Sequence, residues 1–275
     1  LSFIKKIKNY IIILGTSIIL FIYLLETYLT FSLIKPSSKD LIYENQTGKK
    51  WDTRKRSQVY EDLKKINNEI KLVINPNFYF DKNYQIFPLS GYSNSKTIYC
   101  NENGYYSIYQ SDRFGFNNPD EEWDKKEIEF LLIGDSFTHG ACVNRPNDVG
   151  SVLRNLSKKS VLNLGYGGNG PLIELANLRE YLNTNVKKII WIYLEGNDLH
   201  NLSYEIKDKI LIKYLNDTTF VQNLKLKQDK INNLVDNVIK NEISRYYFQR
   251  VKDKKYKYKI LKFIRLNNTK KVLFE

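Results

Sequence analysis

Methionine is absent from this chain of 275 residues, so the sequence does not begin at an initiator. At the other end, residues 271–274 form an apolar run of the kind that begins a β-strand. We therefore expect a fragment of a longer protein, truncated at both ends.

Alanine is absent before Ala141, and this absence bears on the apolar segment near the N-terminus. That segment covers residues 10–34 with Glu26 as its single acidic interruption, and about 20 apolar residues suffice to span a bilayer. A secretory signal peptide would need small residues at its cleavage site. We therefore expect residues 1–34 to be an uncleaved transmembrane anchor, with a cleaved signal peptide as the alternative.

The lysines that flank the apolar segment indicate its orientation. Lys5, Lys6 and Lys8 precede it and favour a cytoplasmic N-terminus. The contrast is weakened by the lysines that follow the segment, namely Lys35, Lys39, Lys49 and Lys50. We expect a single-pass protein of the cell membrane whose main domain is extracytoplasmic.

Cysteine occurs only at Cys100 and Cys142. In an exported domain such a lone pair is typical of a disulfide, which here would tie the N-terminal region to the loop that follows Ser136. Two unrelated buried thiols are the alternative.

Acidic residues are scarce towards the C-terminus: residues 200–275 contain 18 basic and 8 acidic side chains, in a chain of net charge +13. No nucleic-acid-binding motif accompanies this excess. We interpret the basic residues as a solvated surface beside an anionic membrane or polysaccharide, and we expect no nucleic-acid partner.

Strands and helices alternate after residue 125. Apolar runs and helical periodicity predict, in chain order, a strand at 128–133, a helix at 149–156, a strand at 161–164, a helix at 171–182 and a strand at 188–194. This alternation with short loops is typical of an α/β fold with a parallel, doubly wound sheet. We expect it to form a domain over residues 126–275.

Residues 35–125 lack this alternation and are rich in Tyr, Asn, Gly and Pro. We expect a linker and a loop-rich region that packs on the main domain, with a helix at 58–71 and an extended piece at 97–99. The basic stretch 252–265 is compatible with either an edge strand or a helix.

The first predicted strand ends in Gly134-Asp135-Ser136, which places a hydroxyl at the carboxyl edge of the sheet, where α/β proteins bind ligands. A serine nucleophile needs a base and donors for the oxyanion that forms. Thr138 stands where a Gly-x-Ser-x-Gly elbow requires glycine, so the α/β-hydrolase fold is disfavoured. A serine that merely caps a helix is the alternative.

The second predicted strand leads into Gly165-Tyr166-Gly167-Gly168-Asn169-Gly170, a loop that exposes backbone N–H groups. The loop also matches the Gly-x-Gly-x-x-Gly dinucleotide fingerprint, with Glu195 at the end of the next strand. Nucleotide binding is therefore a rival interpretation, although that fingerprint normally follows the first strand of its unit.

The third predicted strand ends in Gly196-Asn197-Asp198. The Asn197 amide can donate to an oxyanion, and a simple turn or helix cap is the alternative. Because parallel strands end at one edge of the sheet, we expect the three loops to converge.

Together these blocks resemble the SGNH (GDSL-type) hydrolase superfamily, and residues 100–104 and 111–119 resemble its bacterial, membrane-anchored subgroup. The resemblance implies a flavodoxin-like three-layer α/β/α sandwich with strand order 2-1-3-4-5, incomplete in this chain. It implies that Ser136 is the nucleophile, and that the Ser136 N–H, the Gly168 N–H and the Asn197 side chain form the oxyanion hole. It implies neither a metal nor an organic cofactor.

The chain departs from the superfamily in its histidines. The superfamily's base lies in an Asp-x-x-His block, but neither His139 nor His200 has Asp three residues before it. We expect this block in the missing C-terminal part, so that the fragment lacks its base and is inactive.

The resemblance implies a serine esterase or acyl-transfer enzyme acting on O-acyl esters, above all those of surface carbohydrate, through an acyl-enzyme at Ser136. One alternative is a pseudoenzyme that binds glycans without turnover, and another is the nucleotide-binding domain. The acyl group, the acceptor and the oligomeric state stay open.

Overall fold

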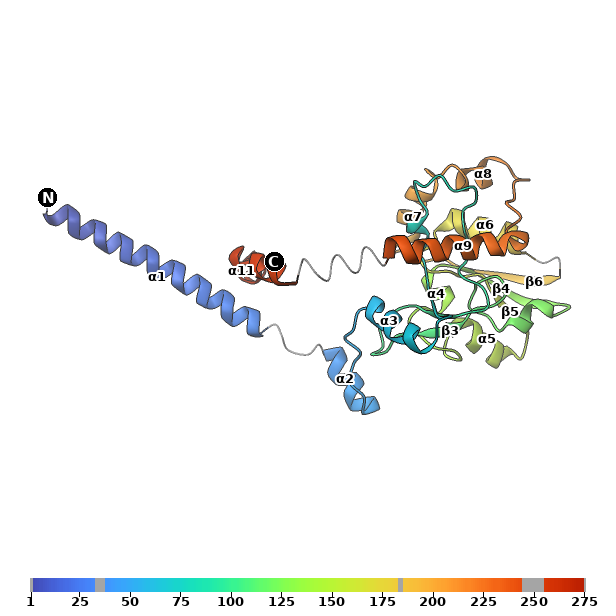
Figure 1. The fold of residues 1–275 in the computed structure, drawn as a ribbon, viewed down its shortest axis with the longest axis horizontal. Helices are drawn as coiled ribbons and strands as arrows, with labels where there is room; N and C mark the ends of the chain where they lie inside the picture. The colour runs from blue at the N-terminus through green and yellow to red at the C-terminus, as the bar shows by residue number, and fades with distance from the viewer. Residues whose placement is uncertain (1, 33–37, 183–184, 244–254, 275) are drawn as a thin grey trace. The chain divides into compact units, whose positions relative to one another are not determined.

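The computed structural model describes residues 2–32, 38–182, 185–243 and 255–274 (Figure 1). The chain forms two compact units, one of Leu1–Lys49 with Tyr246–Glu275 and the other of Lys50–Arg245.

The first unit contains α1 (Ser2–Ser32), whose segment Lys5–Ser32 is long and apolar enough to cross a membrane. Its described side chains are almost all exposed up to Phe21, whereas those from Ile22 to Ser32 are mostly half-buried and Glu26 is fully buried. The same unit contains α2 (Ser38–Thr47), α11 (Lys255–Ile264) and α12 (Asn267–Phe274).

Glu26 in α1 contacts the N-terminus of α12. Its carboxylate accepts hydrogen bonds from the backbone N–H groups of Asn268 and Thr269, at 3.2 and 2.8 Å. A carboxylate at this position satisfies free amides and interacts favourably with the helix dipole.

The helical α12 shows that the strand predicted for residues 271–274 was wrong. The described part of the first unit offers no strand with which this run could pair, and an unpaired strand would leave its backbone groups unsatisfied. The basic stretch 252–265 is helical in the part that the structure describes, where it forms α11.

The second unit contains the predicted parallel sheet. Its strands β4 (Ile128–Gly134), β5 (Val161–Asn163) and β6 (Val186–Ile192) lie in the order β5-β4-β6 and are parallel. The α/β class and the existence of all three predicted strands are therefore confirmed, although β6 begins and ends two residues earlier than the predicted strand 188–194. The strands β4 and β5 are largely buried, whereas β6 is an edge strand on which Trp191 remains 57% exposed.

Two helices connect these strands: α5 (Val149–Ser157) leads from β4 to β5, and α6 (Pro171–Tyr181) leads from β5 to β6. The chain moves to one neighbour of β4 and then back across it, so right-handed crossovers place the two helices on opposite faces. Figure 1 shows α6 and α5 on opposite sides of the strands. The unit also contains α4 (Ser136–His139), α7 (Asp198–Glu205), α8 (Leu211–Asn216) and α9 (Gln228–Val238).

The expected loop-rich region contains a second sheet, of order β1-β2-β3. Its strands are β1 (Lys71–Leu72), β2 (Lys96–Ile98) and β3 (Ile108–Gln110). The predicted helix at 58–71 is shorter than expected, because α3 (Arg56–Ile66) ends at an extended Asn67 and the chain then enters β1.

Cys100 and Cys142 form a disulfide with an S–S distance of 2.08 Å, which confirms the predicted pair. The bond joins the segment after β2 to the loop after α4. The chain of the second sheet is thereby fastened to the element that carries Ser136.

Candidate active site

Ser136 is the first residue of α4, immediately beyond the carboxyl end of β4. The Asp135 side chain caps this short helix by accepting the Phe137 N–H at 2.9 Å. The preceding Gly134 is required sterically: a Cβ at this position would lie 2.1 Å from Thr138 Oγ1 and 2.7 Å from the Ile192 carbonyl oxygen. The strand therefore delivers the serine through a turn that packs against β6.

The Ser136 hydroxyl and the Asn197 amide converge on one oxygen atom. Ser136 Oγ donates to Asp135 Oδ2 at 3.4 Å, and Asn197 Nδ2 donates to the same Oδ2 at 3.3 Å. The Asp135 side chain is fully buried. Two of the three predicted site residues are thus brought together from the ends of β4 and β6.

Gly168 lies on the loop after β5. The Tyr166 N–H donates to the Gly134 carbonyl at 3.2 Å, which ties this loop to the end of β4. The Asn169 N–H bonds back to the Tyr166 carbonyl, and Gly168 has a φ of 85°, the left-handed value that the third position of a type II turn requires. Glycine meets that requirement without strain.

The buried side chain of His139 contacts the loop that carries Gly168. Its Nδ1 accepts the Gly167 N–H at 3.2 Å, and its ring stacks on Tyr99 and Tyr166 with centroids 4.9 and 5.0 Å away. Burial lowers the pKa of His139 to about 3, so the imidazole is neutral. His139 is placed to position the Gly168 turn, and it does not act as a base towards Ser136.

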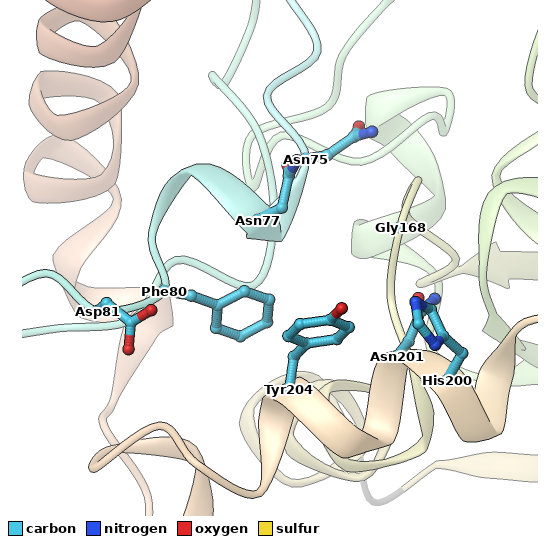
Figure 2. A pocket seen from close by; sticks show the side chains of 8 residues that line it. All are labelled: Asn75, Asn77, Phe80, Asp81, Gly168, His200, Asn201 and Tyr204. Atoms are coloured by element: carbon cyan, nitrogen blue, oxygen red, sulfur yellow. The ribbon is translucent and has the colours of Figure 1, made fainter.

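His200 is exposed on α7, where its ring lies edge-on to Tyr204 at 5.2 Å. Together with Gly168 it lines a cavity of about 440 Å³ (Figure 2). Among the described contacts the Ser136 hydroxyl bonds to Asp135, and neither histidine bonds to it. The structure therefore places both histidines near the Gly168 loop.

Glu205, at the end of α7, was not singled out from the sequence. Its buried carboxylate accepts the N–H groups of Gly170 and Leu172, at 2.6 and 2.9 Å. These amides begin α6, the place where a dinucleotide-binding loop holds its pyrophosphate. Because Glu205 already occupies it, the geometry argues against nucleotide binding by residues 165–170.

Four buried carboxyl groups lie beneath the three loops: Asp135, Glu174, Asp198 and Glu205. Burial, with the neighbouring negative charges, raises the pKa of Glu174 to about 8, although Trp191 Nε1–H donates to this carboxyl at 2.6 Å. Burial also raises the pKa of Glu205 to about 7 and raises the pKa of Asp198. Among the described residues, no His, Cys, Asp and Glu side chains form a group of three or more that could hold a metal ion.

The raised pKa of Glu174 predicts that the second unit loses stability as pH rises. Its pKa is 4.5 in the unfolded chain and about 8 in the folded one, so between these values the folded state binds more protons. At about 1.4 kcal/mol per pKa unit, a loss of a few kcal/mol is expected between pH 5 and pH 9. Urea unfolding at pH 5, 7 and 9 measures it.

Glu174→Gln should flatten this pH dependence, because the amide cannot ionise. Glu195→Gln is the matched control, since Glu195 is exposed in the loop that follows β6. Equal pH profiles for Glu174→Gln and the unmodified chain would contradict the assignment.

Comparison with known protein families, with curated proteins and with solved structures found no match to this chain.

Proposed function

We propose that the protein is a serine esterase or acyl-transfer enzyme that acts on O-acyl esters, above all those of surface carbohydrate. Ser136 is the nucleophile, and the oxyanion donors are the Ser136 N–H, the Gly168 N–H and the Asn197 side chain. The observation that carries this proposal is the convergence of Ser136 Oγ and Asn197 Nδ2 on Asp135 Oδ2. Donors fixed in advance around a developing oxyanion are a major source of catalysis in acyl transfer.

Two further features support the proposal. The order β5-β4-β6 matches the first three positions of a flavodoxin-like 2-1-3-4-5 sheet, so a three-layer sandwich of the SGNH type is the fold we propose. The Cys100–Cys142 disulfide is typical of an oxidising compartment, which supports an extracytoplasmic domain anchored by α1.

The chemistry follows from these positions. Ser136 Oγ attacks the ester carbonyl, the carbonyl oxygen becomes an oxyanion held by the three donors, and expulsion of the alcohol leaves an acyl-enzyme. Water or a sugar hydroxyl then accepts the acyl group. The proton of Ser136 needs a base, and neither described histidine contacts the hydroxyl, so the isolated chain should acylate slowly.

This proposal is tested by acylation with p-nitrophenyl acetate in the presence of imidazole, which serves as an external base. Mass spectrometry of the full chain in detergent should find the acetyl group on Ser136. Ser136→Ala should abolish this adduct, and Asn197→Ala should slow its formation roughly 10²–10³-fold, the usual loss for one oxyanion donor. Ser203→Ala, an exposed serine on α7, is the control and should change nothing. Equal acetylation of the unmodified chain and Ser136→Ala would remove Ser136 from the reaction.

A glycan-binding domain without turnover is the second candidate. Two observations favour this candidate, because each leaves Ser136 without a histidine base. His139 Nδ1 accepts the Gly167 N–H, and no bond between His200 and Ser136 is described. Failure of Ser136 to acylate even with imidazole present would support this candidate over the enzyme.

A further inference from the structure

The cavity beside Gly168 is formed by three segments of the second unit, namely the segment after β1, the loop after β5 and the helix α7 (Figure 2). Its volume of about 440 Å³ falls within the range of ~300–1,000 Å³ that is usual for small-molecule sites. The lining residues are Asn75, Asn77, Phe80, Asp81, Gly168, His200, Asn201 and Tyr204.

Two aromatic rings contribute apolar surface to this cavity. Figure 2 shows the ring of Phe80 extending from the loop towards the ring of Tyr204, which extends from α7. The Tyr204 side chain adds a hydroxyl at the end of its ring, and Tyr204 is 48% exposed, which leaves its surface accessible. Such rings pack against flat ligands that carry both C–H groups and polar edges.

Amide groups surround the rings. Asn75 Oδ1 is buried without a described hydrogen-bond partner, and the Asn75 side chain lies against Gly168, 3.3 Å from the position of a Cβ there. Asn201 donates through Nδ2 to the Asn169 carbonyl at 3.0 Å, which fixes its side chain. Asn77 is exposed at the cavity, so its amide is accessible to the hydroxyls of a bound ligand.

The charge of the lining disfavours anionic ligands. The eight lining residues include neither lysine nor arginine, and Asp81 contributes a carboxylate. Phosphate, sulfate and hexuronate groups therefore find no guanidinium or ammonium group among these residues and meet a like charge at Asp81.

We propose that this cavity binds a neutral sugar ring, which stacks on Tyr204 and Phe80 and bonds through its hydroxyls to the asparagine amides. The role of the sugar as the alcohol part of the ester rests on the proposed function of Ser136. Gly168 borders both the cavity and the proposed oxyanion site, so an acyl group on the bound sugar would lie on the side of the nucleophile.

Saturation-transfer NMR on the full chain in detergent tests this proposal, with the methyl glycosides of glucose, mannose and N-acetylglucosamine as neutral probes and methyl glucuronoside as the anionic probe. At least one neutral probe should bind to the unmodified chain and equally to Ser136→Ala. Tyr204→Ala and Asn77→Ala should each weaken that binding at least tenfold, and Tyr204→Phe should weaken it less because it keeps the ring. Tyr193→Ala removes a tyrosine of similar exposure, 45%, outside the cavity and should bind like the unmodified chain.

The anionic probe isolates the contribution of charge. Methyl glucuronoside should bind at least tenfold more weakly than the neutral glycosides, and Asp81→Asn should narrow that difference. Asp81 has a φ of 58°, which asparagine tolerates, so the exchange preserves the backbone.

The outcomes separate this proposal from the proposed function. The proposed sugar site is overturned if no neutral glycoside binds. It is also overturned if Tyr204→Ala and Asn77→Ala both bind the glycosides as the unmodified chain does while circular dichroism shows the two variants to be folded. Acylation of Ser136 without sugar binding would leave the esterase proposal standing and remove the sugar site. Sugar binding in the cavity without acylation would support the site and remove the esterase.

Discussion

Replacement of Glu205 by alanine should destabilise the second unit by roughly 2–6 kcal/mol, because two buried amides would lose their acceptor at about 1–3 kcal/mol each. The carboxylate bonds to the N–H groups of Gly170 and Leu172 and is fully buried. Urea unfolding followed by circular dichroism measures the loss, with the exposed Glu195→Ala as the control.

Glu205→Ala should also slow the acylation of Ser136 under conditions in which the variant is still folded. Glu205 fastens α7, which begins beside Asn197, to the start of α6, which follows Gly168. Without it the two oxyanion donors are no longer held at a fixed separation, so acylation of Ser136 should slow in folded Glu205→Ala. Glu205→Gln keeps one acceptor oxygen, so its acylation rate should lie between those of the unmodified chain and Glu205→Ala. An unfolding midpoint for Glu205→Ala equal to that of the unmodified chain would contradict this role.

The sequence predicts β4 and β5 well, because strands buried on both faces leave continuous apolar runs. Residues 128–133 correspond to β4 with the addition of Gly134, and the ends of the three strands carry the three polar blocks. Strand ends of a parallel sheet meet at one edge, so the convergence of Ser136 with Asn197 also follows from the sequence.

Features that depend on backbone partners were not predictable. The Glu205 carboxylate accepts hydrogen bonds from backbone N–H groups. Every residue except proline carries such a group, so no sequence pattern marks the residues that pair with Glu205. The sheet β1-β2-β3 consists of strands of two and three residues, too short to show alternation. The apolar run 271–274 is equally short, which explains why its periodicity did not distinguish α12 from a strand.

Removal of the Cys100–Cys142 disulfide should cost roughly 4 kcal/mol, the value that the chain-entropy model gives for a loop of this length. The bond spans 42 residues, so its loss frees a long loop in the unfolded chain. A hydrogen bond accompanies the disulfide in the folded state: Asn103 Nδ2 donates to the Cys142 carbonyl at 3.0 Å, just beyond the helix that carries Ser136.

The double variant Cys100→Ala/Cys142→Ala isolates this contribution in urea unfolding. Dithiothreitol should lower the midpoint of the unmodified chain to that of the variant, and it should leave the variant unchanged. If the reduced chain instead keeps the midpoint of the oxidised one, the bond does not restrain the unfolded state, and the segment after β2 is held to α4 by its hydrogen bonds and packing alone. Because neither cysteine lines the cavity beside Gly168, sugar binding in the folded variant should persist while its stability falls.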